Sequence, residues 1–294
     1  MKTIHHLSLY SILLSATALA GTAEMDSKTI VPVPAAKNSV EFHFRTTVDY
    51  VGSGDFRFKS AGDQDAFHAS AVIGFSIPQN QSIYYTLDGF YDRYDFGTSL
   101  APVPTTLTKI GADIAIEYRA EGDVAFALIA SPGFYGSEVD TDSFNVPITA
   151  YGSYRLSPNL VLVAGVRYNE WSMYQLLPSG GLIWTVNDRW KVRGIVTAPK
   201  VEYTPNQNIT FSVGGELTGG TYVTSKNEQN FPDKHLDYYD IRAGAGVTYR
   251  GWKPLDVNLS AGWSFERNFR YDDIDVEYRV KGAPYIALSA RAIF

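Results

Sequence analysis

The sequence predicts an all-β protein that folds as a membrane-spanning, antiparallel, up-and-down β-barrel of about 14 strands, with about 12 as the alternative count. Three observations lead to this fold class. Apolar and polar residues alternate with a period of two through long segments, short and long connections alternate along the chain, and the last segment ends on Phe294. We expect the barrel to comprise residues 40–294.

Alternation is clearest in four segments: 109–119, 208–217, 239–250 and 255–266. Segments of this length exceed the usual soluble strand of about 5 to 6 residues, and they match the roughly 9 to 11 tilted residues that cross a bilayer. Aromatic residues stand near the ends of several apolar sides, as expected for rings at the membrane surfaces: Tyr118, Tyr239, Tyr249, Trp263 and Phe265.

The connections between the alternating segments differ in length. Links such as "SIPQNQSI" and "RLSPNLVL" are short and contain Pro or Asn at the bend. Four other connections are long and polar: residues 51–65, 131–145, 218–237 and 266–284. This asymmetry is typical of membrane barrels whose short turns face the periplasm. The weakest strand patterns lie in residues 181–186 and 194–204.

The first 23 residues have the layout of a secretory signal peptide, with Lys2, an apolar stretch over residues 7–19 and small residues up to Ala23. Residues 24–39 predict an extended periplasmic lead-in. We therefore expect Sec-type export. The chain contains no Cys, which excludes disulfides and a lipid-modified cysteine, and its formal charge of -6 gives no reason to expect nucleic-acid binding.

Taken together, these features resemble those of bacterial outer-membrane β-barrel proteins of porin-like or uncharacterised families. The resemblance is strongest in the last strand, where alternate residues form an apolar series: Ile286, Leu288, Ala290, Ala292 and Phe294. In that class, such a strand implies recognition by the barrel assembly machinery and a location among outer-membrane lipid and lipopolysaccharide. One departure is that Ala292 and Ile293 stand where the class often has an aromatic residue.

The side of the strands expected to face the lumen carries charges of both signs: Glu41, Arg45, Asp88, Asp113, Glu117, Arg119, Arg167, Arg193, Glu216, Arg242, Asp256, Glu266 and Arg291. They can line a passive, porin-like path for small polar solutes, or they can simply pair across strands and fill a polar interior. Because the two end strands should close the barrel, we expect Arg291 to lie close to Glu41.

Two alternatives to a channel remain open. One is an outer-membrane hydrolase or protease whose weak motifs, Asp140 with Asp142 and Asp233 with His235, resemble the acidic pairs of omptin-type proteases. The other is a structural or adhesive barrel with a plugged lumen. We expect no catalysis, no cofactor and no metal site. The loop carboxylates Asp272, Asp273 and Asp275 could bind cations that bridge lipopolysaccharide phosphates, or could simply be solvated.

Overall fold

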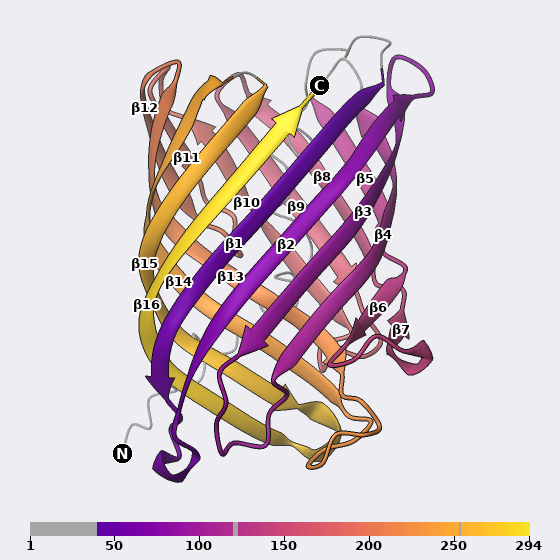
Figure 1. The fold of residues 1–294 in the computed structure, drawn as a ribbon. Helices are drawn as coiled ribbons and strands as arrows, with labels where there is room; N and C mark the ends of the chain where they lie inside the picture. The colour runs from indigo at the N-terminus through magenta and orange to yellow at the C-terminus, as the bar shows by residue number, and fades with distance from the viewer. Residues whose placement is uncertain (1–39, 120–122, 253) are drawn as a thin grey trace, which may run out of the picture.

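The computed structural model describes residues 40–119, 123–252 and 254–294, so the predicted signal peptide and lead-in lie outside the described residues. Fourteen strands form a closed antiparallel barrel in which neighbours in the chain pair, and β1 pairs with β16 (Figure 1). The predicted barrel and the strand count of 14 are confirmed. The strands are β1 (Glu41–Asp55), β2 (Asp63–Pro78), β3 (Ile83–Phe96), β4 (Thr106–Arg119), β5 (Val124–Ala130), β8 (Ile148–Ser157), β9 (Leu160–Tyr168), β10 (Leu176–Thr185), β11 (Trp190–Arg193), β12 (Lys200–Asn206), β13 (Ile209–Val223), β14 (His235–Trp252), β15 (Leu255–Tyr271) and β16 (Val276–Ile293).

Two short strands extend members of this barrel beyond a proline. β6 (Gly133–Gly136) follows β5 after Pro132, and β7 (Phe144–Asn145) precedes β8 before Pro147. Both keep the register of the strand that they extend. Proline has no N–H to donate to a ladder, which explains why each long strand is interrupted there. Three 3₁₀ turns complete the described structure: η2 (Lys59–Ala61), η3 (Thr141–Ser143) and η4 (Asp272–Ile274).

The apolar side of the strands lies on the outside of the barrel. Phe42, Ile114 and Leu288 are about half exposed, at 54%, 53% and 52%, whereas the inward Glu117 and Arg242 are buried. An apolar exterior around a polar interior is the arrangement that a bilayer stabilises. No helix in the described part of the chain is long and apolar enough to span a membrane.

The two ends of the barrel differ. The end that carries the C-terminus has short turns and is called the turn end; the opposite end is called the loop end (Figure 1). The predicted long connection over residues 266–284 is wrong, because β15 continues to Tyr271 and β16 begins at Val276. Beyond the membrane both faces of a strand tolerate polar residues, so the period-two pattern fades although the ladder continues.

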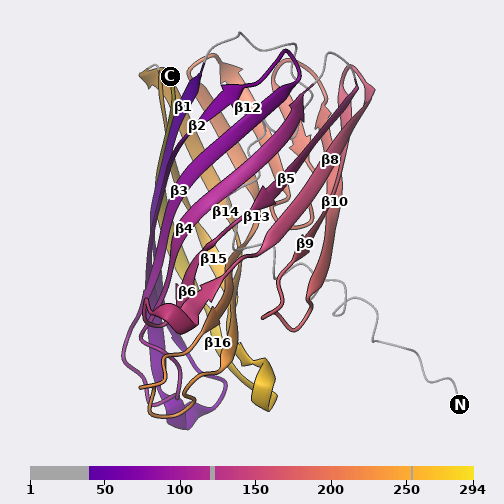
Figure 2. The ribbon, with the colours of Figure 1, turned by 90° about the vertical axis from the view of Figure 1, so that its right-hand side faces the viewer.

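At the loop end, β13 leaves the barrel wall and crosses to β6. The strand bends at Gly219, whose φ is 123°, and Val223 pairs with Gly136 in a parallel bridge. The amide of Ser137 donates to the oxygen of Val223 at 3.0 Å. Because β6 also pairs with β4, nine strands form a smaller closed ring: β1 to β4, β6 and β13 to β16. In Figure 2, β6, β15 and β16 gather in this narrower part and the β9–β10 hairpin ends beside it.

The interior of the nine-strand ring is filled by side chains. Phe96 of β3 packs against Phe269 of β15 and Tyr238 of β14, with ring centroids 4.9 and 5.0 Å apart, so opposite walls are in contact. Buried Leu107, Tyr222 and other apolar residues complete this core. A barrel of about 8 strands has an interior just wide enough for side chains, which explains why a ring of this size is closed.

Candidate functional site

A cavity of about 210 Å³ lies in the lumen beside β11 to β16, where the barrel has all of its strands. Polar and small side chains line much of it, including Arg193, Glu216, Asn258, Ser260, Tyr285 and Ser289. Ile195, Thr197 and Ala198, from the connection between β11 and β12, also border it. We refer to it as the luminal cavity.

Twelve of the predicted lumen residues lie on the side of their strands opposite to the exposed apolar residues: Glu41, Arg45, Asp88, Asp113, Glu117, Arg119, Arg167, Arg193, Glu216, Arg242, Asp256 and Arg291. Many are paired with one another or with neighbouring side chains. Arg119 Nε donates to Glu117 at 2.7 Å, and Arg193 lies 3.2 Å from Glu202. Much of the polar interior is therefore internally compensated.

The prediction that Glu266 faces the lumen is wrong. β15 carries one extra residue, Phe265, relative to β14, because Arg242 pairs with Ser264 and Ile241 pairs with Glu266. Such a bulge shifts the alternation of the residues that follow it. Glu266 consequently accepts a hydrogen bond from Arg57 outside the ring. The next residue, Arg267, takes the inward position and is fully buried.

The predicted proximity of Arg291 and Glu41 is also wrong in register, although the strands pair as expected. Arg291 lies opposite Arg45 on β1 and opposite Asp256 on β15. Glu41 lies next to the chain terminus instead, since the amide of Phe294 donates to the oxygen of Phe42 at 2.8 Å. No turn connects the first and last strands, so no local sequence signal fixes their register.

A buried network of charges crosses the barrel at the base of the ring. Asp49 accepts a hydrogen bond from His68 at 2.6 Å and forms an ion pair with Arg242 at 2.8 Å. Arg242 Nε donates to Asp240 at 2.6 Å. His68 Nε2 lies 3.4 Å from Asp92. Asp49, Asp92 and Asp240 lie on the inward side of their strands, and only the pairing of the strands connects them to His68. Each charge has a partner of opposite sign, as burial of an ion requires.

The barrel wall is discontinuous between β10 and β13. The connection between β11 and β12 lies partway along the barrel wall and does not reach the loop end. The Val196 amide donates to the oxygen of Gly180 at 3.2 Å, and the Leu217 amide donates to the oxygen of Thr197 at 3.0 Å. Gly180 lies in the middle of β10. Toward the loop end from there, no ladder joins β10 to β13 within the described ranges. We call this boundary, between residues 176–179 and 218–223, the seam.

Both edges of the seam avoid part of the cost of unpaired backbone in a membrane. The carbonyls of Gly180 and Leu182 accept hydrogen bonds from the β11–β12 side. Toward the loop end, the next residue of β10 whose backbone faces that side is Pro178. Proline has no N–H, so no donor is left without a partner there. On β13, the oxygen of Gly219 accepts from Lys109 Nζ at 2.8 Å. The missing ladder is thus accommodated by the residues that border it.

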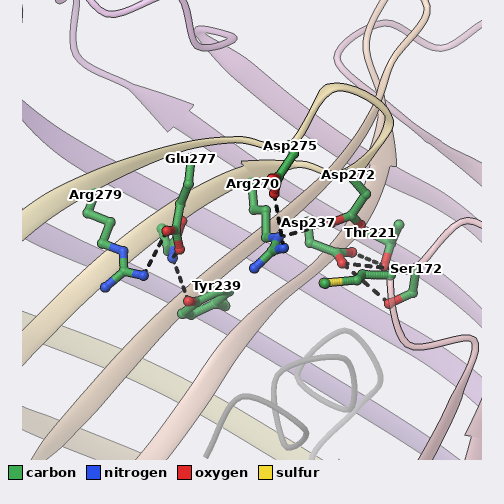
Figure 3. Close-up of polar contacts among 11 residues, drawn as sticks. Ser172, Thr221, Asp237, Tyr239, Arg270, Asp272, Asp275, Glu277 and Arg279 are labelled. Carbon is green, nitrogen blue, oxygen red and sulfur yellow. Dashed lines mark hydrogen bonds and ion pairs between the residues drawn. The ribbon is translucent and has the colours of Figure 1, made fainter. Parts of the chain in front are cut away.

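Across the seam, the connection over residues 169–175, which we call the flap loop, is attached to the ring. Ser172 Oγ and the Met173 amide donate to Asp237 Oδ2 at 3.3 and 3.4 Å, and Thr221 Oγ1 donates to Asp237 Oδ1 at 2.5 Å (Figure 3). Sequence reasoning missed this arrangement. Asp237 and Thr221 come from the ring strands β14 and β13, so one carboxylate joins the flap loop to the ring.

A second carboxyl group, Asp272 of η4, lies against Asp237. Burial, followed by the neighbouring charge of Asp237, raises the pKa of Asp272 to about 7. Burial likewise raises the pKa of Asp237. Asp237 is in register with Arg270, which lies beyond the lipid-facing Trp263 and Phe265, so this pair stands outside the membrane band.

A family model matches the part of the chain that begins at β5 and ends within β16. The sequence profile described as a domain of unknown function (DUF6268) matches residues 124–291, which is more than half of the chain. The chain belongs to the DUF6268 family. A comparison of the DUF6268 chain with curated protein sequences gives no match.

Solved structures of outer-membrane channels are similar to this DUF6268 barrel at low sequence identity. A TodX deltaS2S3 mutant monoaromatic hydrocarbon channel has 12% identity and a TM-score of 0.51, with 88% of this chain and 92% of that chain covered. The COG4313 outer membrane channel from Pseudomonas putida F1 has 11% identity and a TM-score of 0.49, over 89% and 98%. The DcaP channel of Acinetobacter baumannii has 11% identity and a TM-score of 0.38, over 87% and 96%. The first of these similarities supports the fold and nothing beyond it.

The DUF6268 barrel does not assemble the predicted hydrolase residues into one hydrogen-bonded site. Asp140 accepts from the Ser143 amide and caps η3, Asp142 pairs with Lys226 at 2.7 Å, and His235 Nδ1 lies 3.4 Å from Asp273. Among the described residues, His235 forms hydrogen bonds with Asp273 and none with Asp140, Asp142 or Asp233. The same part of the chain contains no cluster of acidic and histidine side chains suited to a metal, Asp272, Asp273 and Asp275 included.

Proposed function

We propose that this DUF6268 protein is an outer-membrane transport barrel that passes small, uncharged amphiphilic molecules through its wall at the seam. One observation carries the proposal: the luminal cavity borders the β11–β12 turn below the seam, whereas the axial route is closed by the ring. With the short turns in the periplasm, the cavity lies on the periplasmic side and the ring on the extracellular side. The protein reaches the outer membrane by Sec-type export, and the barrel assembly machinery recognises its last strand.

The energetics favour the seam over the axis as a route. A solute on the axis must displace buried aromatic side chains such as Phe96, Tyr238 and Phe269, each worth about 1.5 to 3 kcal/mol of burial. Separation of β10 from β13 breaks no strand ladder. The proposal therefore retains the transport function expected from the sequence, but it changes both the route and the class of solute.

The surfaces that border the route support a small amphiphilic solute. On the membrane side, Leu176 and Val196 are 66% and 53% exposed. On the luminal side, Thr218 and Tyr285 supply polar groups, and the charge of Arg193 is compensated by Glu202. A cavity of about 210 Å³ is smaller than typical ligand pockets of about 300 to 1,000 Å³. We assign no catalytic role to Asp140, Asp142, Asp233 or His235.

The test compares uptake with ion conductance. In Gram-negative cells, expression of the protein should raise the initial uptake of radiolabelled 2-phenylethanol and leave that of lactose unchanged. In planar bilayers the purified protein should give no steady ion current. A steady current together with lactose uptake would show a polar axial pore instead. Absence of uptake for both solutes, with folded protein in the membrane, would leave the plugged structural barrel.

A further inference from the structure

At the loop end, hydrogen bonds from both sides of the seam converge on one carboxylate. Asp237 receives Ser172 and Met173 from the flap loop on one oxygen and Thr221 from the ring on the other. Trp171 of the flap loop also stacks on His235 of β14, with ring centroids 5.3 Å apart. Figure 3 shows the carboxylate of Asp237 between Thr221 and Ser172.

Asp272 makes this attachment sensitive to protons. Its carboxyl group lies against that of Asp237, and within the described part of the chain its buried Oδ2 accepts no hydrogen bond from a protein donor. Contact between two buried carboxyl groups is favourable only when they share a proton. Figure 3 shows Asp272 beside Asp237, on the side away from Ser172. If both groups ionise, two negative charges confront each other in a largely buried site, where charge repulsion is weakly screened.

The other charges around the pair come from three elements. Arg270 of β15 lies 3.2 Å from Asp272 and 3.5 Å from the exposed Asp275. Arg167 of β9 acts on Asp237 from the luminal side. On β14, His235 is occupied by Asp273, whose Oδ2 accepts from the His235 amide at 2.9 Å. Arg270 moderates the effect of Asp272 but does not remove it, since the pKa of Asp272 remains raised to about 7.

We propose that Asp237 and Asp272 form a proton-operated latch that holds the flap loop against the ring and keeps the seam closed. The inference rests on the proposed function, because it names how the transport route would be regulated. The occupant of the site is a proton, and the moving part is the β9–β10 hairpin with its flap loop. Release of the loop frees β10 to separate from β13.

The sign of the pH dependence follows from the two states. In the released state both carboxyl groups are solvated and have the ordinary aspartate pKa of about 3.9. In the latched state the pair retains its proton up to about pH 7. The latched state therefore binds more protons, so the stabilisation is present at acidic pH and is lost as the pH rises through about 7. Between pH 5.5 and 8.5, the ratio of released to latched loop should rise about 30-fold.

The experiment measures the loop directly. The chain has no Cys, so Tyr174→Cys in the flap loop can carry a single nitroxide label in the full, membrane-inserted protein. Its spectrum should become more mobile as the pH is raised from 5.5 to 8.5, with a midpoint near pH 7. In Asp272→Asn, which keeps a polar group of the same size but cannot ionise, the label should stay immobile throughout. Asp275→Asn, changed at a carboxylate that also contacts Arg270, is the control and should keep the transition.

The outcomes separate the latch from the transport route. A label whose mobility does not change between pH 5.5 and 8.5, or an unchanged midpoint in Asp272→Asn, overturns the latch. Heat-modifiable migration on gels establishes that each variant is folded. If the label reports release but 2-phenylethanol uptake stays constant over the same pH range, the latch stands and the route through the seam fails. If uptake also rises with pH, both are supported.

Discussion

Lys109 of β4 and Gly219 of β13 are joined across the loop end of the barrel by a hydrogen bond of 2.8 Å from the lysine Nζ to the glycine carbonyl. The ammonium also lies 5.2 Å from the centre of the Tyr222 ring. Lys109 is buried, and Gly219 is the residue at which β13 leaves the wall. The contact therefore stabilises the bend that creates both the nine-strand ring and the seam.

Replacement of Lys109 with Met should destabilise the ring. The substitution keeps an unbranched apolar stem but leaves the Gly219 carbonyl without its donor, which costs about 1 to 3 kcal/mol for a buried group. Guanidinium unfolding followed by tryptophan fluorescence measures the loss. Lys281→Met is the control, because its partner Asp55 is exposed and the pair is worth about 0 to 1 kcal/mol. Equal losses in the free energy of unfolding for the two substitutions would contradict a stabilising role of Lys109 at the bend.

Gly219→Ala should disrupt the bend itself. A Cβ at this position would lie 2.1 Å from the oxygen of Tyr238, and φ is 123°, a value that L-residues rarely adopt. The backbone strain alone costs about 1 to 3 kcal/mol. Gly89→Ala, in β3, is the matched control because the nearest atom is 3.8 Å from the added carbon. We expect a lower yield of heat-modifiable protein for Gly219→Ala and a normal yield for Gly89→Ala.

Phe294 should matter for assembly more than for the stability of the finished barrel. Its side chain is 70% exposed and faces the membrane, so its removal eliminates few packing contacts. Deletion of Phe294 should lower the amount of heat-modifiable, membrane-inserted protein, whereas Phe294→Tyr should preserve it. The unfolding midpoint of the protein that does insert should change little. Normal insertion after the deletion would remove the basis for an assembly signal at this residue.

The sequence predicts the strands and their faces because each residue of a membrane strand contacts either lipid or lumen, so the alternation records both. The position of Glu266 could not be predicted in this way, because the bulge at Phe265 depends on pairing with β14 and no local sequence pattern indicates it. The ring and the seam are harder still to predict from the sequence. They depend on the bridge between Val223 and Gly136, two residues far apart in the chain. The weak strand patterns at residues 181–186 and 194–204 were the only sequence signal near the seam.

A covalent link across the seam should abolish transport. Met173 in the flap loop and Thr221 in the ring both donate to Asp237, so cysteines at the two positions should be within reach of a cleavable bismaleimide. In the Met173→Cys, Thr221→Cys variant, crosslinking should remove the protein-dependent uptake of 2-phenylethanol, and cleavage of the linker should restore it.

Met173→Cys alone, treated with the same reagent, controls for modification of the flap loop without a link to the ring. It should transport at the rate of the untreated double variant, because the labelled loop can still separate from β13. The fraction of crosslinked protein is read from its migration after digestion. Full crosslinking with unchanged uptake would show that solute does not pass between β10 and β13, since these strands could no longer separate at the loop end.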